Sequence, residues 1–327
     1  MARAFSGIQP SGDVHLGNYL GAIRRWAREQ HNDTAVYCIV DLHALTLQPD
    51  PSELESNTIT LTQILVAAGL DPDVVTLFVQ SQVHEHTELA WLMECTASFG
   101  ELRRMHQFKE KSDQAEFVSA GLFTYPALQA ADILLYDTDQ VPVGDDQRQH
   151  LELVRDLALR FNNRYGQTFV VPEHVIPPVA ARVMDLQNPT TKMSKSQESP
   201  QGTVGVLEDP RDIERKFKRA VTDSGTEVVY DPETKPGVSN LLAILAAATD
   251  ATPADLAGNY TRYASLKQDC ADAVVELLRP LRQRYEDLAS DPETTRQILN
   301  KGAEKAQSRA AETMRRVRER VGLPPRD

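Results

Sequence analysis

The sequence predicts an α/β fold in which a doubly wound, Rossmann-like parallel sheet is followed by an α-helical region. Residues 35–40 and 74–80 are short runs rich in Val, Phe, Tyr and Ile and bounded by Asp or Pro, which is typical of buried strands. Helix-period stretches alternate with them at residues 17–30, 51–68, 87–105 and 125–136. This alternation indicates a parallel sheet that binds ligands at the carboxyl ends of its strands.

The character of the sequence changes after residue 192, and from residue 209 onward we expect almost only helices. These helices are separated by proline-containing breaks at residues 231–232, 235–237, 252–253 and 291–292. A chain of 327 residues is long enough for about two domains. We place their boundary in the segment 199–205, which divides the chain into residues 1–204 and 205–327.

The composition excludes several classes of protein. The 35 basic and 47 acidic side chains give a net charge of −12, which argues against a general DNA-coating protein. The three scattered cysteines suit neither a disulfide framework nor a zinc cluster. The N-terminus lacks the apolar core of a signal peptide, and no apolar stretch approaches the ~20 residues of a membrane span. We therefore expect a soluble, cytoplasmic protein that makes no membrane contact.

The C-terminal segment is an exception to the acidic balance. Residues 301–327 hold eight basic and four acidic side chains, and Lys301, Lys305 and Arg309 recur at helical spacing. Two interpretations stay open here: a solvated helix with mixed charges, and a local basic surface for nucleic acid.

A turn before the first predicted helix has the chemistry of a nucleotide site. Residues 7–18 read Gly-Ile-Gln-Pro-Ser-Gly-Asp-Val-His-Leu-Gly-Asn. His15 and Asn18 are three residues apart at a helix start, where they can donate hydrogen bonds to phosphate oxygens. Gly17 carries no side chain, so that a flat base could approach the backbone. Taken alone, the pattern equally fits a turn with a structural histidine.

A second segment strengthens the nucleotide interpretation. Residues 191–196 read Thr-Lys-Met-Ser-Lys-Ser and place two ammonium groups and three hydroxyls close together. Lys192 and Lys195 can act as paired positive charges beside a polyphosphate, where they would stabilise a departing pyrophosphate.

Together these segments resemble the paired signatures of the class I aminoacyl-tRNA synthetases, His-Ile-Gly-His and Lys-Met-Ser-Lys-Ser. Asn18 stands where the general pattern has a second His, and Asn there is typical of the tryptophanyl-tRNA synthetases. The likeness extends through residues 100–111, 143–150, 220–223 and 235–242. It implies catalytic roles for His15, Asn18, Lys192 and Lys195. The ATP site that it implies consists of Gln9, Pro10, Ser11, Gly17, Asn18, Gly144, Asp145, Asp146, Val183, Lys192, Met193, Ser194, Lys195 and Ser196.

The same resemblance implies the reaction and its partners. The substrates would be L-tryptophan, ATP and tRNA(Trp), with Mg²⁺ brought by the polyphosphate and no dedicated metal ligands in the protein. Residues 1–204 would form the catalytic domain and residues 205–327 an α-helical anticodon-binding domain. A homodimer is implied by the family alone.

Asp132 is the most informative carboxylate in the sequence. It lies between Leu128 and Leu135 on a largely apolar helix face, where a carboxylate needs hydrogen bonds or a cation. An internal salt bridge or backbone contact would serve, and so would an indole N–H, which only donates. By resemblance Asp132 matches the tryptophan-recognising aspartate. The other expected tryptophan-binding residues are Phe5, Gly7, His43, Tyr125, Gln129, Val141, Val143 and Gln147.

Related enzymes remain as alternatives. A tyrosyl-tRNA synthetase would carry a Tyr hydroxyl where this chain has Phe5, so Phe5 favours an indole substrate. Gln129 matches the tyrosyl enzymes and favours tyrosine. A nucleotidyltransferase of the same superfamily would lack the helical region after residue 205, and a silent RNA-binding paralogue would have lost the two signatures.

Overall fold

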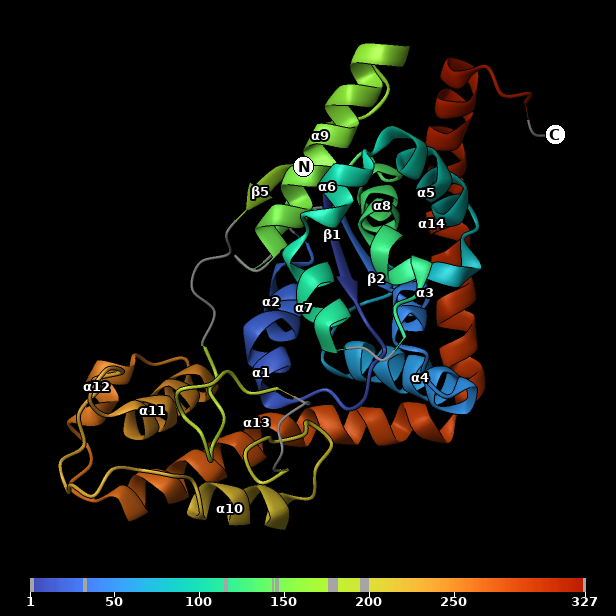
Figure 1. Ribbon diagram of the computed structural model, residues 1–327. Helices are drawn as coiled ribbons and strands as arrows, with labels where there is room; N and C mark the ends of the chain where they lie inside the picture. Colours follow the sequence, from blue (N-terminus) through green and yellow to red (C-terminus); the bar gives the residue numbers. More distant parts are fainter. Residues whose placement is uncertain are drawn as a thin grey trace.

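A computed structural model of the chain describes residues 3–31, 34–114, 117–142, 144, 147–175, 182–194 and 200–325 (Figure 1). It contains a five-stranded sheet in the order β3-β2-β1-β4-β5, with every neighbouring pair parallel. The predicted doubly wound parallel sheet is therefore confirmed. The strands are β1 (Arg3–Ile8), β2 (Thr34–Ile39), β3 (Thr76–Val79), β4 (Gln140–Pro142) and β5 (Glu173–Val175).

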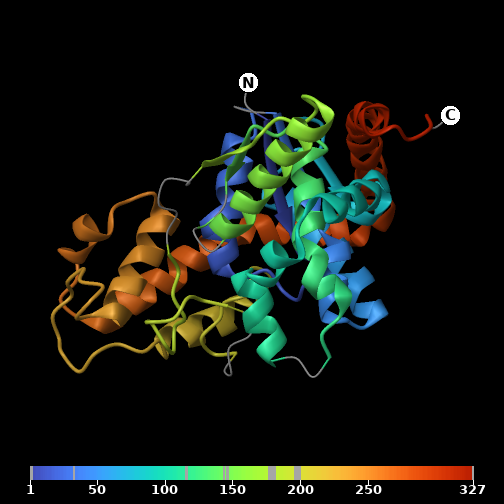
Figure 2. The ribbon, with the colours of Figure 1, turned by 45° about the horizontal axis from the view of Figure 1, so that its top comes forward.

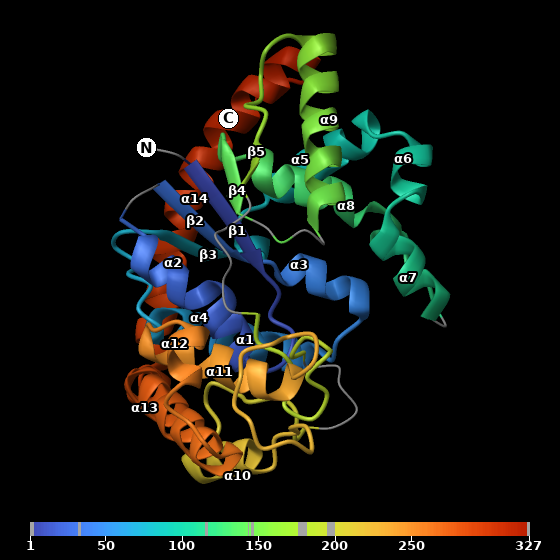
Figure 3. The same ribbon diagram turned by 90° about the vertical axis from the view of Figure 1, so that its left-hand side faces the viewer.

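Both faces of the sheet are buried under helices. Along β2, Tyr37 and Ile39 belong to one hydrophobic core, whereas Val36 and Cys38 belong to the other, because successive strand residues point to opposite faces. Figure 3 shows α2 (Arg24–Glu29) and α4 (Pro51–Ala67) on one side of the strands. The other side carries α5 (Glu85–Thr96), α8 (Ala120–Leu134) and α9 (Arg148–Tyr165).

Short helices connect these elements. The first helical segment begins as α1 (Leu16–Asn18), continues as the π-helix η1 (Tyr19–Ile23) and then becomes α2. The predicted helix 87–105 is divided, because Ser98 caps the separate helix α6 and interrupts the run after α5. The remaining short helices are α3 (Asp41–Ala44), η2 (Leu45–Leu47), η3 (Gln80–Gln82), α6 (Phe99–Arg103) and α7 (His106–Gln114).

The region after residue 205 is helical, as predicted. Four of its helices start with proline at their first position, where the missing N–H costs nothing. Figure 2 shows α10, α11 and α12 grouped beside the sheet, with α13 leading back to it. The helices are α10 (Pro210–Lys218), α11 (Pro236–Thr249), α12 (Pro253–Ala257) and α13 (Tyr263–Ser290).

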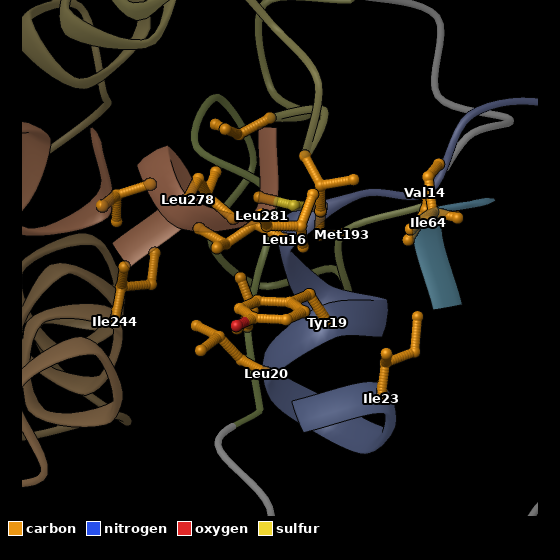
Figure 4. Packing of buried hydrophobic residues seen from close by; sticks show 14 of the residues in the cluster. Val14, Leu16, Tyr19, Leu20, Ile23, Ile64, Met193, Ile244, Leu278 and Leu281 are labelled. Atoms are coloured by element: carbon orange, nitrogen blue, oxygen red, sulfur yellow. The ribbon is translucent and has the colours of Figure 1, made fainter. Parts of the chain in front are cut away.

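One continuous core joins this region to the sheet. Leu16 and Tyr19 from the first helical segment lie in the same cluster as Ile244 of α11 and Leu278 of α13 (Figure 4). Burial of this kind stabilises by about 25 cal/mol per Å² of apolar surface. The helices of residues 210–290 and the first helix of the sheet region therefore support each other.

The last helix, α14 (Pro292–Val321), returns to the sheet and packs along the edge strand β3. Ala306, Ala310 and Val317 belong to the core that contains Phe78 of β3. The boundary near residue 205 stays a prediction, although a helix from the second predicted domain is part of the core of the first.

The basic residues of α14 bind the sheet region. Lys301 pairs with Asp73 at 2.5 Å, Lys305 donates to the carbonyl of Pro72 at 2.7 Å, and Arg316 pairs with Asp137 at 2.7 Å. Arg318 also pairs with Glu88. These four cations therefore contact the sheet region, whereas a local basic surface for nucleic acid stays a prediction.

Gly302→Ala is expected to reduce the free energy of unfolding by about 3 kcal/mol. A Cβ at this position would lie 1.7 Å from the carbonyl oxygen of Leu77, so that α14 must move off β3. Gly258→Ala is the control, because a Cβ there meets nothing within 4 Å. Urea unfolding of both variants provides the measurement, and equal stability would show that the contact between α14 and β3 is unimportant.

Candidate functional site

The candidate site lies where the order of the strands reverses. The chain runs from β1 to β2 on one side and later enters β4 on the other side of β1. Ligands of open α/β sheets bind at such a switch point, outside the carboxyl ends of the strands. Here Gly7 of β1 and Val141 of β4 border a cavity of about 320 Å³, which is within the range for a small ligand.

The cavity gathers the predicted amino-acid-binding residues. Eight of the nine line it: Phe5, Gly7, His43, Tyr125, Gln129, Asp132, Val141 and Gln147. Val143 lies outside the described residues. Gln9, which we assigned to ATP, lines this cavity too. Further lining residues that the sequence did not reveal are Ser6, Trp26, Val40, Thr46, Gln107, Ile133 and Pro142.

Asp132 is 1% exposed and accepts hydrogen bonds from three side chains. His43 Nε2 lies 2.7 Å from its Oδ2, and Gln80 Nε2 and His86 Nδ1 lie 2.6 Å from its Oδ1. Burial disfavours the charged carboxylate, but the charge and hydrogen bond of His43 and the hydrogen bond of His86 lower its pKa to about 2. Asp132 is therefore an ionised acceptor at the cavity wall, with internal partners as well.

Tyr125 is a second polar group in the cavity. Its hydroxyl lies 2.6 Å from Nε2 of His150, and its ring meets the ring of His43 edge to face at 6.2 Å. Burial raises the pKa of Tyr125 to about 12, so that its hydroxyl stays protonated at neutral pH. Tyr125 can therefore both donate and accept a hydrogen bond.

His15 and Asn18 form a reciprocal cap at the start of the first helical segment. The backbone N–H of Asn18 donates to His15 Nδ1, and the backbone N–H of His15 donates to Asn18 Oδ1, both at 3.3 Å. The cap leaves the proton of a neutral His15 on Nε2 and leaves the Asn18 amide nitrogen as a donor. A Cβ at Gly17 would lie 3.0 Å from the His15 ring, so a side chain here would press against the capping histidine.

The second nucleotide segment lies against this cap. Met193 is buried beside Leu16 (Figure 4), and its Cβ is 3.6 Å from where a Gly17 Cβ would stand. The backbone N–H of Met193 donates to the carbonyl of Val183 at 3.1 Å. The backbone N–H of Leu16 donates to the carbonyl of Val204 at 2.8 Å. This bond joins the chain that follows the segment to the same turn. Two signatures that are distant in the sequence therefore meet in space.

The other predicted nucleotide residues are placed less fully. Pro10 is buried and Ser11 exposed in the turn after β1, and Lys192 is exposed beside Met193. Ser194 accepts through its carbonyl from Thr203 at 2.9 Å, and Gly144 accepts in the same way from Gln147 at 3.0 Å. The remaining four lie outside the described residues: Asp145, Asp146, Lys195 and Ser196.

Within the part of the chain that the structure describes, no group of three or more His, Cys, Asp or Glu side chains is placed to hold a metal ion. No helix in these ranges combines the length and the apolar character that crossing a membrane requires.

Comparisons with known proteins agree with this site. Residues 1–279 match the family model described as tRNA synthetases class I (W and Y). The chain is 53% identical to Tryptophan--tRNA ligase 1 of Streptomyces coelicolor, over 99% of this chain and 98% of that protein.

Solved structures give the same result. The crystal structure of tryptophanyl-tRNA synthetase from Mycoplasma pneumoniae superposes with a TM-score of 0.92 at 36% identity, covering 99% of this chain and 98% of that one. The Campylobacter jejuni enzyme, complexed with ADP and tryptophan, gives a TM-score of 0.87 at 34% identity, over 98% and 100%. The chain therefore belongs to the tryptophan and tyrosine family of class I tRNA synthetases, within its tryptophan--tRNA ligase branch.

Proposed function

We propose that this chain joins L-tryptophan to tRNA(Trp) in two steps. The tryptophan carboxylate attacks the α-phosphate of ATP, which forms tryptophanyl-adenylate and releases pyrophosphate. The terminal adenosine of the tRNA then takes the tryptophanyl group and releases AMP. The observation that carries the choice of amino acid is the buried Asp132 carboxylate in a cavity walled by Phe5 and Val141. An indole supplies one N–H for that acceptor and a flat apolar body for those walls.

The cavity also offers groups for the rest of the amino acid. Tyr125 and Gln147 line it and can accept hydrogen bonds from the substrate ammonium group. Gln129 lines it as well, and we assign it to polar contact with the substrate rather than to the recognition of a phenol. His43 and Gly7 would contact the indole ring, because both border the same space as Asp132.

ATP would bind between the His15 cap and the segment that contains Met193. His15 and Asn18 would donate to phosphate oxygens, and Lys192 and Lys195 would stabilise charge on the departing pyrophosphate. No side chain is required as a covalent nucleophile. Mg²⁺ would neutralise phosphate charge, held by phosphate oxygens and water, because this ion dehydrates reluctantly and usually keeps several waters.

We also propose a homodimer and a helical tRNA-binding region. Large apolar side chains are exposed near the start of α8: Leu45, Leu47, Phe99 and Phe117 are each more than half exposed. Exposed apolar surface of this kind marks protein interfaces, and a second copy is the partner that the family implies. Sedimentation at micromolar concentration tests the dimer. Residues 205–327 would form the region that contacts the tRNA anticodon. The cytoplasm, where tRNA is charged, is the proposed location.

Amino-acid-dependent exchange of pyrophosphate into ATP tests the function. We expect exchange with tryptophan, and at least about a hundredfold lower kcat/KM with tyrosine and phenylalanine. Phenylalanine would leave the Asp132 acceptor unpaired, and tyrosine would not fill a site shaped for an indole. Exchange driven by tyrosine would replace the proposed substrate, and the absence of exchange with any amino acid would contradict the proposed activity.

A further inference from the structure

The two oxygens of the Asp132 carboxylate have different surroundings. Among the residues that the structure describes, Oδ1 accepts from Gln80 and His86, whereas Oδ2 accepts from His43 alone. A carboxylate oxygen has two lone pairs, so Oδ1 is saturated and Oδ2 retains one acceptor position. His43 lines the cavity, and Gln80 and His86 do not. The remaining acceptor therefore lies on the oxygen that shares the cavity side with His43.

His86 is held by a second buried group. It is 0% exposed, and its Nε2 lies 2.7 Å from the hydroxyl of Tyr136. Nδ1 must donate, because the ionised Asp132 only accepts. Burial raises the pKa of Tyr136 well above its ordinary value, so the hydroxyl keeps its proton. A neutral His86 that carries its proton on Nδ1 has an acceptor at Nε2, to which this hydroxyl donates. The hydrogen bonds thus run in one direction, from Tyr136 through His86 to Asp132.

Tyr136 is itself fixed by aromatic packing. Its ring stacks on Phe5, which lines the cavity, with a centroid distance of 5.8 Å and an interplanar angle of 10°. It also contacts Phe78 at 5.8 Å. Rotation of Tyr136 would therefore disturb a cavity wall as well as the hydrogen bond to His86.

The side chain of Gln80 is oriented toward the Asp132 carboxylate. Its Nε2 donates to Asp132, while its own amide oxygen is buried and has no partner among the described residues. An unsatisfied buried acceptor is unfavourable, so this orientation of the side chain reduces stability. The orientation that leaves this oxygen unsatisfied is the one in which Gln80 Nε2 donates to Oδ1 of Asp132.

From these contacts we propose that His86, fixed by Tyr136, is a positioning residue for amino-acid selection: with Gln80 it saturates Oδ1 of Asp132, so that Oδ2 alone receives the substrate ring N–H. The proposal rests on the proposed function, because it assumes an indole in the cavity. His86 does not touch the substrate, and its effect passes through the orientation and charge of Asp132.

The test uses the full-length chain in pyrophosphate exchange. His86→Leu removes the donor, and we expect KM for tryptophan to rise about 30-fold while kcat and KM for ATP change less than about threefold. Preference for tryptophan over benzothienylalanine, an isostere without the N–H, should shrink by a similar factor. His86→Asn offers an amide donor in place of Nδ1. It should bring both KM for tryptophan and the preference over benzothienylalanine most of the way back to the wild-type values. Tyr136→Phe keeps the ring packing and should raise KM about fivefold.

His84→Leu is the matched control, since His84 precedes the same helix, is half exposed and pairs with Glu85 instead. It should behave as the wild type. Equal losses in His86→Leu and His86→Asn would reduce His86 to a packing residue, and an unchanged KM in His86→Leu would overturn the proposal while leaving tryptophan exchange by the wild type intact. Imidazole nitrogen chemical shifts add a test without substrate: we expect the proton of His86 on Nδ1, and a proton on Nε2 would contradict the direction of the hydrogen bonds.

Discussion

Asp132→Asn is expected to lower kcat/KM for tryptophan in pyrophosphate exchange by about a thousandfold. The amide oxygen of the variant would take the place of Oδ1, because Gln80 and His86 both donate there. The amide NH₂ would then stand in place of Oδ2 and present a donor to the indole N–H. The loss of a charged hydrogen bond and the meeting of two donors together cost about 4 kcal/mol.

The design separates this effect from damage to the fold. Asp156→Asn makes the same chemical change on the exposed face of α9, and it should leave exchange unchanged. KM for ATP should stay near the wild-type value in both variants, because the His15 cap is a separate structure. Wild-type kinetics in Asp132→Asn would show that the carboxylate serves only its internal partners.

The fold could be predicted from the sequence where burial is extensive. The predicted strands 35–40 and 74–80 overlap the observed strands Thr34–Ile39 and Thr76–Val79 closely, because buried parallel strands are apolar on both faces. The proline-containing breaks at residues 235–237, 252–253 and 291–292 coincide with the starts of α11, α12 and α14. No pattern indicated β5, since a three-residue strand at the sheet edge carries too little periodicity to recognise.

The site could be predicted only where a motif carries its residues. His15 and Met193 belong to recognisable segments, and the structure brings their segments together. Gln80 and His86 do not, because their importance comes from contacts with a residue about 50 positions away, which no local pattern encodes. Gln80 was the easier of the two to predict, since it ends the predicted strand 74–80 in a fold that binds ligands at the carboxyl ends of its strands.

His15→Ala is expected to lower kcat of exchange about a hundredfold with little change in KM for tryptophan. The substitution removes a phosphate donor and also the cap of the first helix, so it should cost about 1 kcal/mol of unfolding free energy. Unfolding by urea, measured beside exchange kinetics, distinguishes these two losses. The amino-acid cavity should be unaffected, because His15 is not among the residues that line it.

His15→Asn tells a catalytic role from a structural one. Asparagine is among the preferred N-cap residues, and its side-chain oxygen can accept from the Asn18 N–H as His15 Nδ1 does. It should therefore restore stability, while its shorter side chain cannot place a donor where His15 Nε2 stands. Restored stability with kcat still reduced about a hundredfold would assign His15 to the phosphates. Recovery of both would make the histidine a helix cap alone and would leave the lysines of residues 192–195 to stabilise the pyrophosphate.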